Sequence, residues 1–338
     1  MDLLTQIVME HVMKAQLDSV TAANYHRQDL SPVIYLEGMV DAKFFLRLPT
    51  EPMKDKIHYW SKTSIDAPDG TSGYAAEGAK PDDRHTTPDR LSNNLFRRGL
   101  ACKITDTEIA LFAAAGGWDI FSAGTLQKFN DEMALQMWLN LKKLLSLLNY
   151  VFINGVGTTT IPASSGVADV QCDGLIQALY YYDTATPAVA QGNIVDAEGA
   201  SLSEAMIIAL GKLIADRRTG MKPQVQYVTS AQKKIINTWG GTLFFTRNEN
   251  VPAGRDVSTY NNGYFSTNID IEYDLPTTEN YAVSCMVDHT DMKRLDLIPI
   301  GVDPLAKIDR TMQKMVNWEG SFKYGTPVSS GQIINLNE

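Results

Sequence analysis

Hydrophobic residues recur every three or four positions through residues 125–153, and this spacing predicts one long amphipathic helix. Its apolar stripe consists of Leu126, Phe129, Met133, Met137, Leu141, Leu144, Leu148 and Val151. Thr125 suits an N-cap, and Asn154-Gly155 suits a stop. At 1.5 Å per residue the helix would be about 43 Å long, longer than a typical globular helix. The pattern indicates either the spine of an elongated body or an ordinary long core helix.

Shorter patterns predict the remaining elements. Helices are expected at residues 1–24, 202–219 and 231–239, strands at 31–49, 225–229, 316–324 and 332–336, and a loop at 248–268. Ser201 and Glu204 form a capping box for the helix that Gly220 would end. Because helices and strands are mixed without β-α-β alternation, the predicted fold class is α+β.

The composition changes sharply between residues 62 and 94. This segment is rich in Gly, Pro, Ser, Thr and Asp and has almost no apolar residues to bury. A structureless loop of this length is unusual in a compact domain, so we expect a two-stranded arm that projects from the body. An isolated hairpin is only marginally stable in water, and a neighbouring copy of the chain could supply the surface it needs. A disordered loop or a flexible lid is the alternative.

Composition narrows the functional classes. The chain has 338 residues, 44% of them hydrophobic, which excludes a wholly disordered protein. The net charge of −9 argues against a surface that grips nucleic acid, though not against a protein that encloses it. No apolar run approaches the ~18 residues of a membrane span, and Asp2 stands where an export signal would need positive charge. The three cysteines, at 102, 172 and 285, are too far apart for a disulfide framework and suit a reducing compartment.

The sequence contains few patterns that resemble catalytic motifs. The five histidines show no HExxH spacing, and no two cysteines have metal-ligand spacing. Residues 155–158 resemble a phosphate loop but lack GK[ST] and follow a helix, and residues 162–166 are not GxSxG. We therefore expect no enzyme activity, no metal and no cofactor.

Several side chains are candidates for contacts between subunits or with nucleic acid. The aromatic residues Trp60, Tyr74 and Phe96 lie on or beside the arm, where they could anchor it on a partner or pack at its root. The pair Arg97-Arg98 could form ion pairs between subunits, and the pair Lys142-Lys143 could face enclosed nucleic acid. For both basic pairs, plain solvation is the alternative.

Four motifs, in this order, resemble the major capsid proteins of tailed double-stranded-DNA bacteriophages with the Hong Kong ninety-seven type of capsid fold. Residues 75–81 resemble the "EGA.P" stretch of the family, and residues 100–106 resemble a strand ending in "(I/V)(S/T)(D/E)". Residues 152–157 resemble the "FLNGDG" turn, although Val156 replaces the usual Asp. Residues 225–231 resemble the strand-then-helix "(V/M)(N/S)P" element. The order and spacing are more specific than any single motif.

The resemblance implies a named architecture. Residues 1–48 would form an N-terminal arm, 49–108 the extended E-loop, 109–157 the P domain with its spine helix, 158–290 most of the A domain, and 291–338 strands that return to the P domain. Arg247 and Arg255 would lie in axial loops that face the five-fold and six-fold axes.

The predicted function is that of a structural major capsid protein. Its pentamers and hexamers would build an icosahedral phage head that encloses double-stranded DNA without sequence specificity. Its partners would be many copies of itself, a portal and scaffolding or decoration proteins, with no membrane, and it would assemble in the host cytoplasm. The first alternative is an encapsulin-like nanocompartment shell, and the second is an α+β hydrolase whose lid is the arm.

Overall fold

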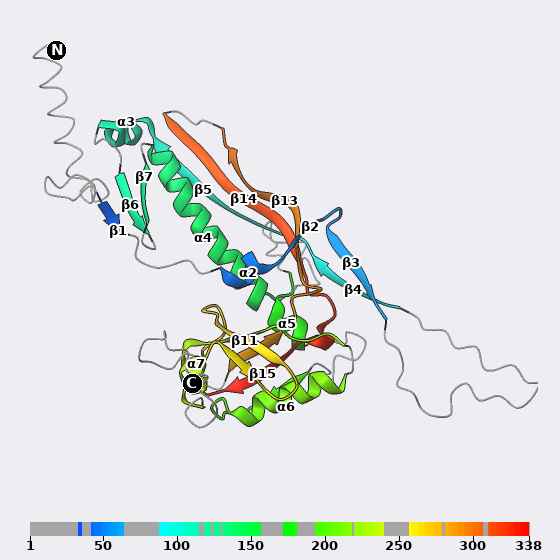
Figure 1. Cartoon of the computed structure of the whole chain (residues 1–338). Coiled ribbons are helices and arrows are strands. Elements are labelled where there is room, and N and C mark those ends of the chain that lie inside the picture. The colour runs from blue at the N-terminus through cyan, green and yellow to red at the C-terminus, as the bar shows by residue number, and fades with distance from the viewer. Residues whose placement is uncertain are drawn as a thin grey trace, which may run out of the picture. The chain divides into compact units, whose positions relative to one another are not determined.

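The computed structural model describes residues 33–35, 42–63, 88–114, 118–122, 125–129, 131–156, 172–180, 193–217, 220–239, 257–278, 281–306 and 310–337. The chain divides into two compact units (Figure 1). The first comprises residues 1–39, 102–139 and 305–313, and the second comprises residues 40–101, 140–304 and 314–338. The helix predicted for residues 1–24 lies outside the described residues.

The first unit contains a small sheet and a helix. The sheet has the order β1-β6-β7, with β1 at Val33–Tyr35, β6 at Trp118–Ser122 and β7 at Thr125–Phe129. Helix α3, Asp106–Ala114, begins with a capping box in which Thr105 and Glu108 exchange hydrogen bonds. Phe112 and Leu135 are buried together against the ring of Phe129.

The long helix starts later than its periodicity predicts. Helix α4 spans Glu132–Asn154, about 34 Å at 1.5 Å per residue, and its first residues belong to the first unit. The prediction that Thr125 caps it is wrong, because residues 125–129 pair with β6 as a strand. Asp131 is the observed cap, since its carboxylate accepts a hydrogen bond from the Met133 backbone at 3.0 Å. The predicted stop at Asn154 is confirmed.

The second unit contains two complete sheets and most of a four-stranded one, whose residues 102–105 and 311–313 belong to the first unit. A four-stranded sheet has the order β2-β13-β14-β5, with β2 at Thr50–Pro52, β13 at Lys293–Pro304, β14 at Thr311–Lys323 and β5 at Phe96–Thr105. A two-stranded sheet pairs β3, Ile57–Lys62, with β4, Asp89–Asn94. The predicted two-stranded arm is therefore confirmed at its root, and residues 64–87 lie outside the described residues.

The third sheet has six strands in the order β10-β11-β9-β12-β15-β8. Its strands are β8 at Ile194–Asp196, β9 at Val225–Val228, β10 at Thr259–Asn261, β11 at Ser266–Ile271, β12 at Ala282–Val287 and β15 at Gly331–Leu336. The sheet contains one parallel crossover, because the chain passes from β9 through α7 and β10 to β11, which pairs parallel to β9. The expected loop at 248–268 is wrong in its second half, which contains β10 and the first residues of β11, whereas residues 248–256 lie outside the described residues.

Three helices of the described chain pack against the six-stranded sheet: α5 at Leu175–Tyr180, α6 at Glu204–Asp216 and α7 at Ser230–Trp239. A 3-10 turn, Pro327–Ser329, precedes β15. The predicted capping box is wrong in register, because Ser203 caps α6 by accepting from the Met206 backbone. The core between α6 and the sheet is aliphatic and includes Ile207, Leu210, Met286 and Ile333.

A second, aromatic core joins α2, α4 and β14. Residues 43–47 were expected as extended chain, but they form helix α2, Lys43–Arg47. A strand would point Phe44 and Phe45 to opposite faces, whereas the helical turn lets both be fully buried. The Phe45 ring meets Phe152 edge-on, with centroids 5.0 Å apart, and Trp318 and Phe322 complete the cluster. Within the described ranges, no helix combines the length and the apolarity needed to cross a bilayer.

Candidate assembly surface

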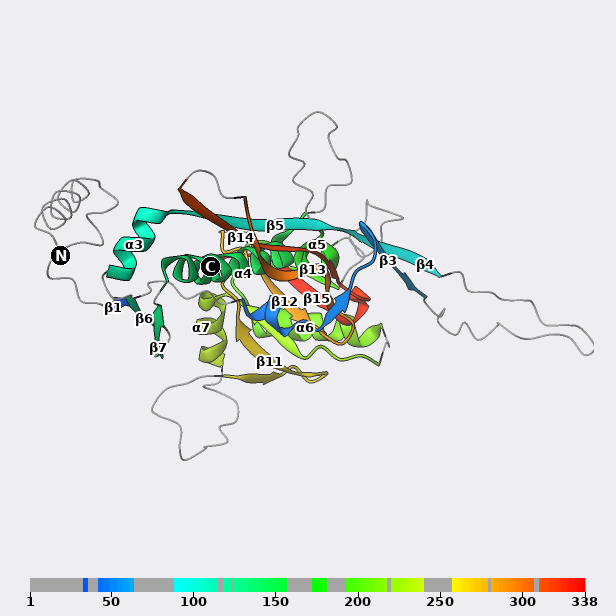
Figure 2. The same ribbon diagram turned by 90° about the horizontal axis from the view of Figure 1, so that it is seen from above.

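Among the residues that the structure describes, the root of the arm packs on its own chain through one face. In β3 and β4 alternate side chains point to opposite faces, and Trp60 lies opposite Leu91 on the inner face. The Trp60 indole donates to the Gly325 carbonyl at 3.0 Å, and its ring meets Tyr324 edge-on at 4.8 Å. The paired strands β3 and β4 themselves run away from the body of the second unit (Figure 2).

Asn93 fastens the arm root to the body. Its side-chain amide is buried and donates to the Phe322 carbonyl at 2.7 Å and to the Asp173 carbonyl at 3.0 Å. Its side-chain oxygen accepts from the Asp173 backbone N–H at 2.9 Å. Sequence reasoning missed this residue because it lies in a polar run with no motif. Only the strand phase, which puts Asn93 opposite His58 and in step with Leu91, could have indicated it.

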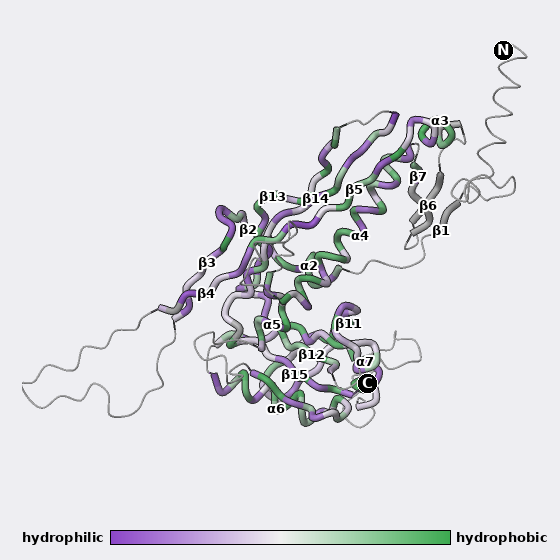
Figure 3. The backbone as a smooth tube through the Cα atoms, turned by 180° about the vertical axis from the view of Figure 1, so that it is seen from behind, coloured by the Kyte–Doolittle hydropathy of each residue, from purple (hydrophilic) through white to green (hydrophobic). Residues whose placement is uncertain are grey.

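The outer face of the arm root exposes apolar side chains, as far as the chain is described. Ile57 and Tyr59 are 38% and 52% exposed, and the Arg90 guanidinium lies 5.5 Å from the Tyr59 ring centroid. In Figure 3 the tube of β4 is largely hydrophilic, and Ile57 and Tyr59 lie on β3, the strand paired with it. Exposed aromatic side chains next to arginine are typical of contact surfaces between proteins.

Of the residues predicted to contact another subunit, Phe96 and Trp60 instead pack against their own chain. Phe96 is only 2% exposed, and its ring packs against Trp318 at 5.1 Å, so the prediction that it touches another subunit is wrong. Trp60 packs on its own chain, so strand phase makes Tyr59 the outward aromatic residue. Arg97 pairs with Glu319 at 3.0 Å while its side chain stays 63% exposed. Tyr74, Arg247 and Arg255 lie outside the described residues.

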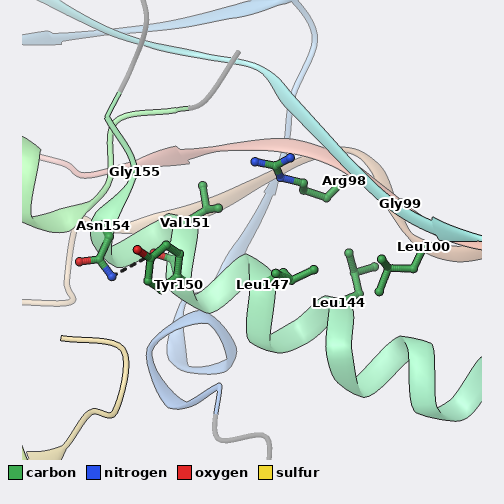
Figure 4. A pocket seen from close by; sticks show the side chains of 9 residues that line it. All are labelled: Arg98, Gly99, Leu100, Leu144, Leu147, Tyr150, Val151, Asn154 and Gly155. Atoms are coloured by element: carbon green, nitrogen blue, oxygen red, sulfur yellow. Dashed lines mark hydrogen bonds between the residues drawn. The ribbon is translucent and has the colours of Figure 1, made fainter. Parts of the chain in front are cut away.

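The last turns of α4 and the strand β5 enclose a pocket of about 350 Å³ within the second unit (Figure 4). Its lining is mainly aliphatic, with Leu100 from β5 and Leu144, Leu147 and Val151 from α4. Arg98 and Tyr150 bring polar groups to it. Arg98 therefore lies beside the spine helix, a position that its sequence neighbours do not reveal. On α4, Lys143 lies directly before Leu144 and is exposed, and Lys142 is half-buried.

The helix ends where two backbone segments cross closely. The Gly174 N–H donates to the Gly155 carbonyl at 2.8 Å. A Cβ at Gly155 would lie 2.4 Å from the Cys172 carbonyl oxygen, so only glycine fits there. This explains why the turn after Asn154 requires glycine at its first position.

A buried polar junction joins α4, α2 and the end of β11. The Asn149 side chain is fully buried and its oxygen accepts from the Phe45 backbone at 2.9 Å. Its amide donates to the carboxylates of Glu272 at 2.9 Å and Asp274 at 2.6 Å. Next to it, Arg47 pairs with Asp270 at 2.7 Å. This junction fixes the spine helix to the six-stranded sheet.

His289 lies in the same region, with its Nε2 2.9 Å from the Tyr227 hydroxyl. Burial, reinforced by the nearby Arg47 charge, lowers the pKa of His289 to about 4. A histidine whose pKa is lower in the folded state than in the unfolded state, where it is about 6.5, contributes stability at pH values above 6.5. That contribution is lost as the pH falls toward 4. We expect the loss to reach about 3 kcal/mol.

Urea denaturation of the wild type and of His289→Gln at pH 7, 5.5 and 4.5 would measure this effect. Carboxylates titrate in both proteins, so the difference between the two isolates the histidine. The free energy of unfolding should fall less steeply with pH in the variant. Parallel curves would show that His289 does not titrate in this window.

Two of the three cysteine thiols, those of Cys172 and Cys285, are buried. Burial raises the pKa of the Cys285 thiol to about 12 and also raises the pKa of Cys172, so both thiols stay protonated at neutral pH. In the described ranges, no three His, Cys, Asp or Glu side chains converge to hold a metal ion.

Comparisons with known proteins agree with the geometry. The family model of the SU10 major capsid protein matches residues 15–337. No curated protein sequence matches the chain. Among solved structures, the capsid of Myoviridae phage XM1 is 10% identical, with a TM-score of 0.57 over 94% of this chain and 99% of that one.

Two further structures share the fold at similar distance. The capsid of a native GTA particle is 12% identical, with a TM-score of 0.61 over 95% of this chain and 98% of that one. The holo-SrpI encapsulin complex from Synechococcus elongatus is 11% identical, with a TM-score of 0.55 over 95% and 96%. The predicted α+β capsid fold of the Hong Kong ninety-seven type is thus confirmed. Because the family model spans nearly the whole sequence, the chain belongs to the SU10 major capsid protein family, structural proteins whose many copies form the capsid shell of a tailed-phage virion.

Proposed function

We propose that this subunit forms the pentamers and hexamers of an icosahedral head, assembled in the host cytoplasm around packaged double-stranded DNA. Residues 49–108 would act as the E-loop and 109–157 as the P domain with its spine. Residues 158–290 would supply most of the A domain, between the N-terminal arm at 1–48 and the returning strands at 291–338.

The arm root is the observation that supports this proposal. Its inner face is satisfied by Trp60 and Asn93, whereas its outer face exposes Ile57 and Tyr59. A ribbon fastened at one end and apolar on its outer face gains stability by lying on another surface. Subunits that lie across one another add many modest contacts, and this multivalency closes a shell.

The net charge of the chain supports DNA as the proposed content of the shell. The chain carries a net charge of −9, which suits a wall that encloses DNA and does not bind it tightly. Lys142 and Lys143 on α4 would provide local, sequence-independent contact with phosphates. Portal, scaffolding and decoration proteins would complete the particle.

Electron microscopy of the purified protein at high concentration tests the proposal directly. We expect closed, uniform shells with five-fold vertices, in equilibrium with capsomers in light scattering. A monodisperse 37.4 kDa monomer under all conditions would contradict the proposal and favour an enzyme with a lid.

An encapsulin-like shell is the second candidate, supported by the structural similarity to the holo-SrpI encapsulin complex. The two differ in contents. Particles purified from the natural source would hold nuclease-sensitive DNA after opening if the chain is a head protein, and a defined protein if it is a nanocompartment. The family match favours the head protein.

A further inference from the structure

Helix α2 is held on the six-stranded sheet mainly through Arg47. The helix has only five residues, too few to be stable in water by itself, so its contacts with the rest of the chain must hold it in place. The Arg47 guanidinium pairs with Asp270 of β11 at 2.7 Å and donates to the Tyr227 hydroxyl of β9 at 3.2 Å. Lys43 adds an exposed hydrogen bond to the Ile271 carbonyl.

The hydrogen bonds beyond Arg47 run in one direction. A guanidinium can only donate, so the Tyr227 oxygen accepts from Arg47 and its hydroxyl hydrogen is left for another acceptor. His289 Nε2 lies 2.9 Å from that oxygen and is the acceptor within reach. The neutral imidazole therefore carries its proton on Nδ1, a buried atom that makes no hydrogen bond within the described residues. The chain of hydrogen bonds from Asp270 to His289 is complete only while His289 is neutral.

A second proton on His289 would break this chain. Nε2 would become a donor and would point at the Tyr227 oxygen, as the Arg47 guanidinium already does. The hydroxyl hydrogen of Tyr227 would then lose its acceptor, and a buried donor without a partner destabilises the arrangement that contains it. The new positive charge would also lie close to that of Arg47.

Charged groups from the neighbouring elements act on the His289 ring. Arg47 on α2 repels a protonated ring, whereas Asp288, next to His289 in the chain, and Asp270 on β11 attract one. Burial and the Arg47 charge outweigh the two carboxylates and lower the pKa of His289 to about 4. The Phe44 ring of α2 also packs against the imidazole, with centroids 5.8 Å apart. A protonated His289 therefore acts first on α2.

We propose that these side chains form an acid-sensitive latch, in which protonation of His289 releases Arg47 from Tyr227 and α2 detaches from β9 and β11 while the rest of the second unit stays folded. Phe45 ties the other side of α2 to the spine helix, because its backbone N–H donates to the Asn149 side chain at 2.9 Å. Opening α2 would therefore remove one link between the six-stranded sheet and α4. The inference does not depend on the proposed function, since it concerns contacts within one subunit.

The size of the effect follows from the difference in proton affinity between the closed and the open latch. Opening α2 gives His289 its ordinary pKa of about 6.5, whereas the closed latch holds that pKa at about 4. A histidine whose pKa is lower in the closed state stabilises that state above pH 6.5, and this advantage is lost as the pH falls toward 4. The population with α2 open should therefore rise at least about 10-fold between pH 6.5 and pH 4.5.

Amide hydrogen exchange of the purified full-length protein, corrected for the intrinsic pH dependence of exchange, measures this opening. The reporters are the backbone amides of Phe45 and Leu46, which donate to Asn149 and to the Ala42 carbonyl. Their protection should fall at least about 10-fold from pH 6.5 to pH 4.5. It should also depend little on dilute urea, because a local opening exposes little surface.

Three variants test the parts of the latch. His289→Gln keeps a neutral acceptor for the Tyr227 hydroxyl, so α2 should lose its pH response. His58→Gln changes a half-buried histidine at the arm root and is the matched control, in which the response should remain. Arg47→Met removes the anchor, so α2 should be poorly protected already at pH 6.5 and change little with acid.

Other outcomes would overturn the inference. Equal protection of α2 at both pH values in the wild type would show that acid does not open it. An unchanged response in His289→Gln would assign the effect to the carboxylates of Asp270 or Asp288. A loss with the same steep urea dependence as the amides of α6 would show that the whole unit unfolds and that no local latch exists.

Discussion

Deletion of residues 66–88 is expected to abolish closed particles while the subunit stays folded. The deletion leaves Thr63, Ser64 and Ile65 between β3 and β4, and Lys62 is already paired opposite Asp89. A connection of three residues is a common hairpin length, so the ladder can close without strain. The inner-face contacts of Trp60 and Asn93 remain, and the deletion removes none of the buried residues that the structure describes.

Two measurements separate assembly from folding in this deletion. The thermal midpoint should stay within about 3 °C of the wild type, because surface changes away from packed features alter stability little. Electron microscopy should show capsomers or irregular aggregates and no closed shells.

A second variant replaces residues 66–87 with a Gly/Ser linker of equal length and separates length from composition. If side chains such as Tyr74 make the contacts, this variant should fail as the deletion does. Normal shells from the deletion would remove the arm from the assembly mechanism.

The sequence predicts the helices and the arm root better than their boundaries. The spine helix is recognisable because its apolar stripe keeps a helical spacing over many turns, a pattern that a strand or loop would not show. The predicted start of this helix was wrong because, over so short a stretch, Thr125, Leu126 and Phe129 fit the pattern of a strand as well as that of a helix. Strand pairing with β6 decides between the two, and that pairing is a tertiary contact absent from local pattern.

The residues that form the outer face of the arm root also depend on more than the local sequence pattern. Composition alone indicates that an arm exists, because polar residues over that length cannot form a core. Which aromatic residue faces outward depends on strand phase, and Trp60 and Tyr59 are adjacent, so an error of one residue reverses the assignment. The pocket beside Arg98 arises only when β5 lies along α4, and no local pattern records that contact.

The substitution Asn149→Asp is expected to have the largest effect on stability. The change alters hardly any volume, but the new side chain loses both amide hydrogens that now bond the Glu272 and Asp274 carboxylates. It also brings a third carboxylate to a fully buried position beside those two. Breaking a buried polar network and leaving charge uncompensated costs about 3–5 kcal/mol, a large share of the stability of a typical domain.

The pH dependence of this variant identifies the cause. Protonation of the new carboxyl would remove its charge and restore one donor, so its folded-state pKa should be raised above the unfolded value. A raised folded pKa makes the deficit relative to wild type shrink as the pH falls from 7 to 5. Asn140→Asp, a half-exposed position on the same helix, provides the control and should cost less than about 1 kcal/mol at every pH. Denaturant titrations that find a deficit independent of pH would show that lost packing, and not charge, governs this junction between the spine and the sheet.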